Sequence, residues 1–475
     1  MIDRSAISQL FGKWKWKLVP AFFLVLIMAS KWETFSLPGF WDEMWVFINS
    51  GIWISQNSFI QILPGLHSNE IGFGHPPFIF ICLAILYRIF GYSHAVPHVF
   101  SAFFGFLGVY GTYLLGSHLH NRRAGFISGL LLFFSPLYFS QSGLVSAEIF
   151  LTSLAVLYVY FFIIENKLGY IVTGICLALT KEPALAVFVS VLIYQILFES
   201  KRSDFWNRIK YHSIPLIILV LFLSLQGFIT GHAIDNPALQ QSIFSNDFTM
   251  SWFIPQLWHI FRLIFIDQWR FIPSTFILTF SILHYRRITN RTNCLFLFIL
   301  CGFYGAFIFV YFLPRYILTV FPFIFVLAAQ AIIVLERNRI ATNFIVAILC
   351  ILCLYTSYAT PTDDDYGLEV TMSYADYVRA NMDAAKYIEA NFPEKKVYLC
   401  ETKETLTDAK FGYVTKNLNF SSDDYEVATT PVLPYPEQFG CIDEIKSRGL
   451  LFDNIFTHGA VSFVVYVKPG IHRFQ

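Results

Sequence analysis

The stretch Phe40-Trp41-Asp42-Glu43-Met44-Trp45 follows directly on the first long apolar segment of the chain. Two adjacent carboxylates, Asp42 and Glu43, stand here between two tryptophans. Carboxylates are costly at hydrocarbon depth, whereas tryptophan rings settle in the headgroup layer of a bilayer. The stretch therefore predicts an acidic site at a membrane–water boundary, where a lipid-borne substrate would present its polar head. The alternative interpretation is the ordinary acidic start of an amphipathic helix.

The composition of the whole chain indicates a polytopic membrane protein. Of its 475 residues, 56% are hydrophobic and 14% are charged, against about 25% charged residues in soluble globular domains. So large an apolar excess must face lipid as well as other side chains. The net charge of +1 argues against nucleic acid as a partner, because it provides no basic surface to neutralise phosphates.

Basic residues assign the apolar segments to two faces of the membrane. Lysines 13, 15 and 17 precede the first segment, so the positive-inside rule predicts a cytoplasmic N-terminus and places Asp42 outside. We interpret residues 44–62 and 77–90 as surface helices, because the second segment is too short to span. About eleven spans result, and nearly every later basic cluster falls inside. The expected spans are 18–30, 96–115, 124–139, 148–164, 168–180, 184–198, 214–229, 271–283, 295–313, 316–335 and 344–358.

The composition becomes polar after Thr360, which predicts a boundary between two domains. Residues 1–360 would form the transmembrane domain, and residues 361–475 a small α/β domain on the outer face. Within that domain Cys400 and Cys441 could pair if it meets an oxidising compartment. The patterned segments are an amphipathic helix over 374–390 and strands over 396–400 and 461–467.

A set of ionisable residues remains on the predicted outer face after the positive-inside clusters are explained. It consists of Asp42, Glu43, His75, Glu148, Lys181, Glu182, Arg270 and Arg315. Each has an ordinary explanation, such as the snorkelling of an arginine to the interface or a Lys–Glu pair at a helix end. Together they are harder to explain in this way, because basic residues are disfavoured on this face.

Transfer from a lipid-linked phosphate is a reaction that needs such a set. Its leaving group is an anion in the headgroup layer, and cations held there stabilise the charge that develops in the transition state. Lys181 would supply a point charge, and Arg315 a planar fork that matches phosphate. A carboxylate close by could remove the proton from an acceptor hydroxyl as a general base.

Four short motifs resemble, in the same order, those of GT-C glycosyltransferases, which include protein O-mannosyltransferases and bacterial lipid A aminoarabinose transferases. They are Trp41-Asp42-Glu43, Gly74-His75-Pro76-Pro77-Phe78, Leu179-Thr180-Lys181-Glu182-Pro183 and Pro314-Arg315-Tyr316. The resemblance covers residues 17–335, with Phe78 where the family usually has leucine. It implies a GT-C fold and an inverting transfer of a sugar from a polyprenyl-phosphate donor on the extracytoplasmic face. The acceptor would be a hydroxyl on a protein, a lipid or a glycan.

The resemblance also implies roles for individual residues. Asp42 would be the catalytic base, with Glu43 as its catalytic neighbour, and the two cations of the set would contact the donor phosphate. The expected substrate-binding residues are His75, Glu148, Lys181, Glu182, Arg270, Arg315 and Tyr316. The C-terminal domain has no counterpart in the resemblance, so the choice of acceptor is left open.

A divalent cation is used by some members of that family. His67, Glu70 and His75 are close in sequence and could supply ligands. Polar loop residues that face water are the simpler interpretation of the three, and we predict no metal.

Other functions remain open at this point. A ligase of lipid-linked glycans would need similar cations, and an inactive scaffold would not need Asp42. A transporter or flippase would be expected to place ionisable residues near the middle of the membrane and to show matched halves. The expected localisation is the bacterial inner membrane, with the endoplasmic reticulum as the alternative.

Overall fold

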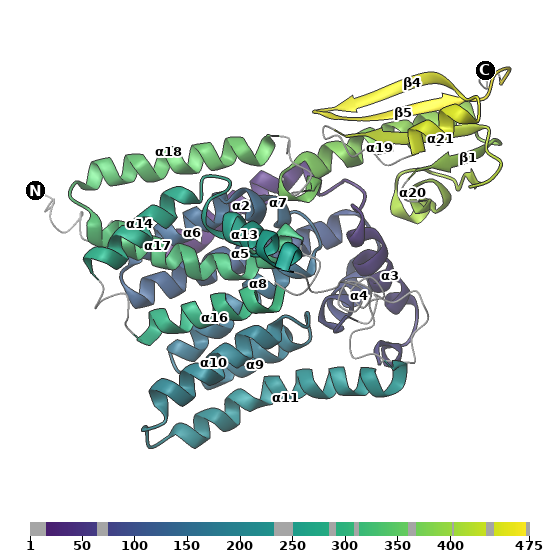
Figure 1. Ribbon diagram of the computed structural model, residues 1–475. Helices are drawn as coiled ribbons and strands as arrows, with labels where there is room; N and C mark the ends of the chain where they lie inside the picture. Colours follow the sequence, from purple (N-terminus) through teal and green to yellow (C-terminus); the bar gives the residue numbers. More distant parts are fainter. Residues whose placement is uncertain are drawn as a thin grey trace, which may run out of the picture.

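A body of helices lies beside a small five-stranded sheet in the computed structural model (Figure 1). We call the end of the body next to the sheet, where Glu148 and Lys181 lie, the sheet end. The opposite end, where Glu165 and Glu199 lie, is called the far end. The structure describes residues 16–63, 75–231, 250–284, 291–307, 313–359, 367–400, 403–433 and 441–471.

The helices of the body coincide with the apolar segments of the sequence. They are α2 (Val19–Lys31), α5 (Ala95–Leu119), α6 (Arg122–Phe134), α7 (Pro136–Gln141), α8 (Ala147–Ile163), α9 (Lys167–Ala178), α10 (Ala184–Glu199), α11 (Phe205–Thr230), α13 (Met250–Phe265), α14 (Phe271–Leu283), α16 (Arg291–Phe307), α17 (Phe321–Leu335) and α18 (Arg339–Tyr358). Each of the expected spans overlaps at least one of them, so the predicted helical class is confirmed. The described helices long and apolar enough to cross a membrane are Ala95–Leu119, Phe205–Thr230, Pro314–Leu335 and Arg339–Tyr358.

Small residues bring the central helices close together. At the crossing of α5 and α6, a Cβ on Gly116 would stand 3.0 Å from the Cα of Gly125. Such close approach of backbones is how helices associate in lipid, where no hydrophobic effect drives them together. The glycines therefore fix the spacing of α5 and α6, and α5 in turn packs against α8.

The two expected surface helices lie side by side at the sheet end (Figure 1). The first comprises the π-helical turn η2 (Glu43–Ile48) and α3 (Asn49–Gln56), followed by the short 3-10 turn η3 (Phe59–Ile62), and the second is α4 (Phe78–Phe90). Arg88 of α4 donates to the carbonyls of Ser55 at 2.9 Å and Ile54 at 3.2 Å. Carbonyls in the last turn of a helix lack the N–H donor four residues further on, so they can accept from a side chain. Arg88 thus joins the second surface helix to the end of the first.

The C-terminal segment forms the expected α/β domain. Its strands are β1 (Lys396–Leu399), β2 (Asn419–Phe420), β3 (Val427–Val432), β4 (Leu451–His458) and β5 (Val461–Val467), and its helices are α19 (Ser373–Asn391), α20 (Glu404–Thr407) and α21 (Cys441–Ser447). The strand order is β2-β1-β3-β5-β4, with β1 parallel to β2 and β3, and β5 antiparallel to β3 and β4. Helix α19 packs against β3, β4 and β5. The predicted helix and both predicted strands are confirmed.

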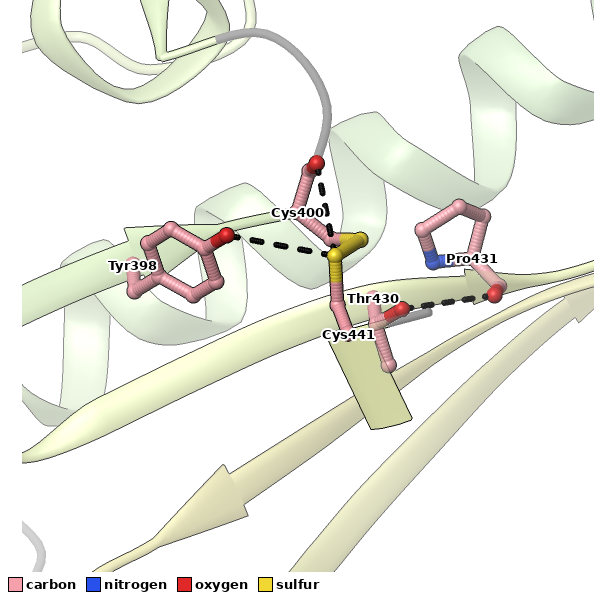
Figure 2. The surroundings of a disulfide bond; sticks show 5 residues. All are labelled: Tyr398, Cys400, Thr430, Pro431 and Cys441. Carbon is pink, nitrogen blue, oxygen red and sulfur yellow. Dashed lines mark hydrogen bonds between the residues drawn. A yellow bond between two sulfur atoms is a disulfide. The ribbon is translucent and has the colours of Figure 1, made fainter. Parts of the chain in front are cut away.

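A disulfide joins Cys400 to Cys441, the pair that the sequence left open (Figure 2). It links the residue after β1 to the first residue of α21, with the two Cα atoms 5.8 Å apart. The ring of Tyr398 lies alongside, with its hydroxyl 3.9 Å from Sγ of Cys441. The bridge holds α21 against the sheet.

The segment between α18 and α19 anchors the domain to the body. The short turn η7 (Leu368–Val370) buries its two apolar residues, and the N–H of Met372 donates to the carbonyl of Ser357 in α18 at 2.7 Å. The domain also touches the acidic stretch, because the ring of Tyr377 in α19 packs edge-on against that of Phe40 with centroids 5.4 Å apart. The C-terminal domain is therefore in contact with the predicted site.

Candidate active site

A cavity of about 1020 Å³ opens at the sheet end of the body. One part of its wall is polar and contains the acidic stretch and the cations. The other part is an apolar groove between α10, α11 and α16, and we call it the apolar groove. The groove is lined by Leu185, Ala186, Val189, Ile193, Leu223, Phe298, Cys301, Gly302, Ala306 and Phe307. Charged groups and a hydrocarbon surface thus meet within one cavity.

Arg315 is the centre of the polar wall. Pro314 begins the 3-10 turn η5 (Pro314–Val320), which carries the guanidinium into the cavity ahead of α17. Its Nη2 is bound to Asp42, and its Nη1 donates to Oε2 of Glu369 at 2.5 Å. Its Nε is 3.8 Å from Oε1 of Glu148. One guanidinium therefore joins three carboxylates that come from distant parts of the sequence.

Lys181 is the second cation of the wall and lies between α9 and α10. Its Nζ is bound to Glu148 and stands 4.6 Å from the ring centroid of Tyr316. Burial acts to lower the pKa of Lys181, but the Glu148 carboxylate outweighs it and the pKa is raised. A raised pKa keeps the ammonium charged, as an anion-binding group must be. A backbone hydrogen bond joins the motif of Lys181 to the motif of His75. The N–H of Phe78 donates to the carbonyl of Leu179 at 2.7 Å.

Asp42 stands on the cavity wall directly before η2. Its side chain is 42% exposed, more than those of the other carboxylates bound to Arg315. The preceding residue, Trp41, has a φ of 39°, which is uncommon for a bulky side chain. The Trp41 ring stacks on that of Phe40 with centroids 5.6 Å apart. Strained backbone of this kind clusters at functional sites, and here it presents the Asp42 carboxylate to the cavity.

Glu43 differs from its neighbour, because its carboxylate is buried and fully engaged. It accepts from the N–H of Phe40 at 2.8 Å and from the N–H of Val145 at 2.6 Å. The Nε2 of buried His98 lies 3.1 Å from the same carboxylate. These contacts tie the acidic stretch to the segment before α8 and to α5. They favour a positioning role for Glu43, and its expected catalytic role stays a prediction.

His75 and Glu182 form a pair at the edge of the polar wall. The Nδ1 of His75 lies 3.0 Å from Oε1 of Glu182, and both side chains are largely shielded from water. Burial acts to raise the pKa of Glu182, but His75 more than offsets it and the pKa is lowered. Both residues line the cavity next to Lys181.

The cavity wall includes all of the expected site residues except Arg270. The guanidinium of Arg270 lies over the ring of Phe321, 4.9 Å from its centroid, and donates to Oε1 of Gln268 at 2.8 Å. The structure therefore does not bring Arg270 to the cavity wall. The positive φ values of Gln268 and Trp269, 51° and 68°, turn the chain immediately before Arg270.

Glu369 is a site residue that sequence reasoning missed. It lies in η7, and burial raises the pKa of its carboxyl against the opposing effect of Arg315. The signal that could have indicated it is the run Leu368-Glu369-Val370, an acidic residue between two apolar ones shortly after the last span.

The sequence predicts no metal here, although His67, Glu70 and His75 could supply ligands. His67 and Glu70 lie outside the described residues. Within the part of the chain that the structure describes, no group of three His, Cys, Asp or Glu side chains is placed to hold a metal ion.

Comparisons with known proteins agree with the fold. Residues 74–225 match the sequence model of the family described as dolichyl-phosphate-mannose-protein mannosyltransferase, which is less than half of the chain. The structure is similar to that of ArnT from Cupriavidus metallidurans bound to undecaprenyl phosphate, with a TM-score of 0.57 and 14% identity over 94% of this chain and 97% of that one. It is also similar to the Archaeoglobus fulgidus oligosaccharyltransferase AglB in complex with an inhibitory peptide and a dolichol-phosphate, with a TM-score of 0.50 and 11% identity over 85% of this chain and 63% of that one. No curated protein matches the sequence. The chain therefore has the same fold as these two proteins.

Proposed function

We propose that this chain, which has the GT-C fold, is an inverting glycosyltransferase that uses a polyprenyl-phosphate sugar as its donor. The observation that carries the proposal is the junction of two cations with the apolar groove inside one cavity. The phosphate of such a lipid would bind Lys181 and Arg315. Its hydrocarbon chain would lie in the apolar groove. The groove follows α10 from Leu185 to Ile193, about 12 Å along the helix, so it can hold several isoprene units.

The similar structures support this choice of donor. ArnT is bound to undecaprenyl phosphate, and AglB is in complex with a dolichol-phosphate. Both ligands combine a phosphate with a polyprenyl chain. The same class of lipid fits the combination of charged wall and apolar groove in this chain.

The proposed reaction is a single displacement at the anomeric carbon of the sugar. The acceptor oxygen attacks from the face opposite the phosphate, and the bond from that carbon to the phosphate oxygen breaks with inversion. Asp42 takes the proton of the acceptor hydroxyl as general base. The electron pair of the broken bond leaves with the polyprenyl phosphate, whose developing charge Lys181 and Arg315 stabilise.

Release of polyprenyl phosphate is the direct test of this function. The protein, reconstituted in liposomes, is given a panel of polyprenyl-phosphate sugars and linked oligosaccharides with a mixture of hydroxyl acceptors. We expect it to consume at least one donor and release the lipid phosphate, and the Asp42→Asn variant not to do so. Movement of donor between leaflets without consumption would instead identify a flippase.

The location of the site is a further part of the proposal. We propose that residues 1–360 are the transmembrane catalytic domain in a bacterial inner membrane. The cavity and residues 361–475 would lie on the extracytoplasmic side, where the environment permits the disulfide.

Thr415→Cys should then react with an impermeant thiol reagent added to intact cells, and Ser203→Cys should not. Both positions are exposed, and the unsubstituted protein gives the labelling background. Outside labelling of Ser203→Cys would refute this arrangement.

A further inference from the structure

Both terminal nitrogens of the Arg315 guanidinium are hydrogen-bonded to carboxylates in the structure, whereas its buried Nε has no hydrogen bond to any of the described residues. Its Nη2 is bound to Asp42, and its Nη1 donates to Glu369 at 2.5 Å. A phosphate that binds an arginine bidentately uses two of these N–H groups. A donor phosphate that binds both terminal nitrogens of Arg315 therefore competes with the two carboxylates for them.

The formal charge of the ion pairs around Arg315 points in the same direction. Asp42, Glu148 and Glu369 provide three negative charges, and Lys181 and Arg315 provide two positive ones, so the formal sum is −1. A phosphodiester would add another negative charge to this shielded group. Opposite charges in a shielded site attract strongly, but an excess of one sign is penalised in the same way. Binding of the phosphate is therefore expected to expel one carboxylate.

Glu369 is the carboxylate best placed to leave. Glu148 is held by Lys181 and its side chain is 4% exposed, so its departure would break a second ion pair. Asp42 is the proposed base, which has to stay beside the reacting atoms. Glu369 contacts one cation, and its removal leaves the Lys181–Glu148 pair intact.

The backbone around Glu369 is fixed, so its side chain can move alone. Its carbonyl accepts from Nε2 of Gln141 at 3.0 Å and from the hydroxyl of Ser140, both in α7. Leu368 and Val370 on either side of it are buried. A rotamer change of Glu369 would therefore release Arg315 without unfolding η7.

We propose that Glu369 is a positioning residue, namely the counter-ion that holds Arg315 at the cavity wall in the empty site and is displaced by the donor phosphate. The proposal rests on the proposed function and adds to it a residue from the segment that begins the C-terminal domain. Because Glu369 competes for Arg315, the site binds lipid phosphate less tightly. The product, polyprenyl phosphate, is therefore released more easily.

Binding of undecaprenyl phosphate to the full-length protein in detergent tests the idea, because this ligand does not depend on the identity of sugar or acceptor. Glu369→Gln and Glu369→Ala should each bind it more tightly than wild type, on the order of tenfold, since one charged hydrogen bond no longer competes. Glu369→Asp keeps the charge with a shorter reach and should tighten binding less. In turnover, KM for the donor should fall with no rise in kcat. A merely structural role would weaken binding instead.

Glu336→Gln is the matched control, because Glu336 pairs with Arg123 at similar burial at the far end. It should leave the affinity unchanged. Equal or weaker binding by all three Glu369 variants, while wild type binds, overturns the inference alone. If wild type itself does not bind undecaprenyl phosphate, the proposed function fails and the inference fails with it.

Discussion

Helices α8 and α10 carry ion pairs at both of their ends, and the two sets differ in their surroundings. At the sheet end Glu148 and Lys181 pair with each other and adjoin Arg315. At the far end Arg208 binds Glu199 through Nε at 3.0 Å and Nη2 at 3.2 Å. Glu165, which follows α8, joins Arg208 at 2.9 Å. Both sets combine acidic and basic side chains at the ends of the same two helices.

Shielding from water alone does not separate the two sets, because both combine shielded and exposed side chains. Arg208 and Glu199 at the far end are each 10% exposed, close to the 12% of Lys181 at the sheet end. Water and salt screen exposed ion pairs, so these pairs contribute little to stability. Shielded charges, in contrast, interact strongly with a charged ligand. The sheet-end set faces the cavity, whereas Arg208 and Glu199 are not among the residues that line it. Ion pairing alone therefore does not mark a site, but shielded charge beside a cavity does.

Replacement of Asp42 should give the largest effect and tests the sheet end most directly. Asp42→Asn keeps the shape but removes the proposed base, so transfer should fall by roughly 10²–10⁴-fold. Binding of undecaprenyl phosphate should survive. Turnover and lipid-phosphate binding are measured on the same preparation.

Glu43→Gln is the companion variant and probes the buried neighbour. It should lower the thermal stability, because Glu43 accepts from two backbone N–H groups, and slow transfer less than Asp42→Asn does. An active Asp42→Asn beside a folded but inactive Glu43→Gln would exchange the two roles. Full activity of both variants would remove the acidic stretch from the mechanism.

The cations come next in expected size. Lys181→Met and Arg315→Met should each reduce kcat by roughly 10²–10³-fold, because a group that stabilises the leaving phosphate is lost. Arg315→Lys should be nearly as poor, since a point charge cannot replace the planar fork. Single-turnover donor cleavage measures the effect. Wild-type rates in both methionine variants would show that neither cation contacts the phosphate.

The far end should respond differently to the same kind of change. Arg208→Met should lower stability by about 3 kcal/mol, because breaking a buried pair leaves Glu199 unpaired. The turnover of each folded molecule should stay at the wild-type level. Thermal unfolding and turnover normalised to folded protein separate the two outcomes. A loss of kcat in folded Arg208→Met would show that the far-end ion pairs also act in the reaction, which would contradict the distinction between the two sets.

The His75–Glu182 pair should show the smallest effect, and it depends on pH. The pKa of Glu182 is lowered from its usual 4.5. The pair therefore contributes stability above about pH 4.5 and loses it as pH falls through the lowered value. Glu182→Gln should cost about 1 kcal/mol at pH 7, and the gap in Tm to wild type should close in acid. A gap that is constant down to pH 3 would contradict the lowered pKa.

Local sequence was enough to predict the assembly of the motifs and most of the helices, although α13 lies outside every expected span. The expected span over residues 148–164 corresponds to α8, Ala147–Ile163, because an apolar run of helical length bounded by polar residues has few alternatives. The motifs of Asp42, Lys181 and Arg315 stand at ends of apolar segments that emerge on one side. Packing of those segments into one body brings the three residues to the same cavity wall.

Two residues show what local sequence does not encode. Arg270 meets the same criteria as Arg315, a basic residue beside an apolar segment, yet its guanidinium lies over Phe321. Glu369 stands 54 positions after Arg315 and reaches it through the docking of η7 on α7. The direction of Glu43 was likewise open, because adjacent residues point different ways. All three depend on tertiary packing.

The apolar groove is open along α10. Leu185, Val189 and Ile193 line it and still have 40%, 39% and 41% of their surface exposed. On the proposed function this opening faces the bilayer, so the donor arrives by lateral diffusion in two dimensions. Occupancy of the site then follows the mole fraction of donor in the membrane. Adding inert lipid to a fixed amount of donor should slow the reaction, although the donor concentration in the tube is unchanged.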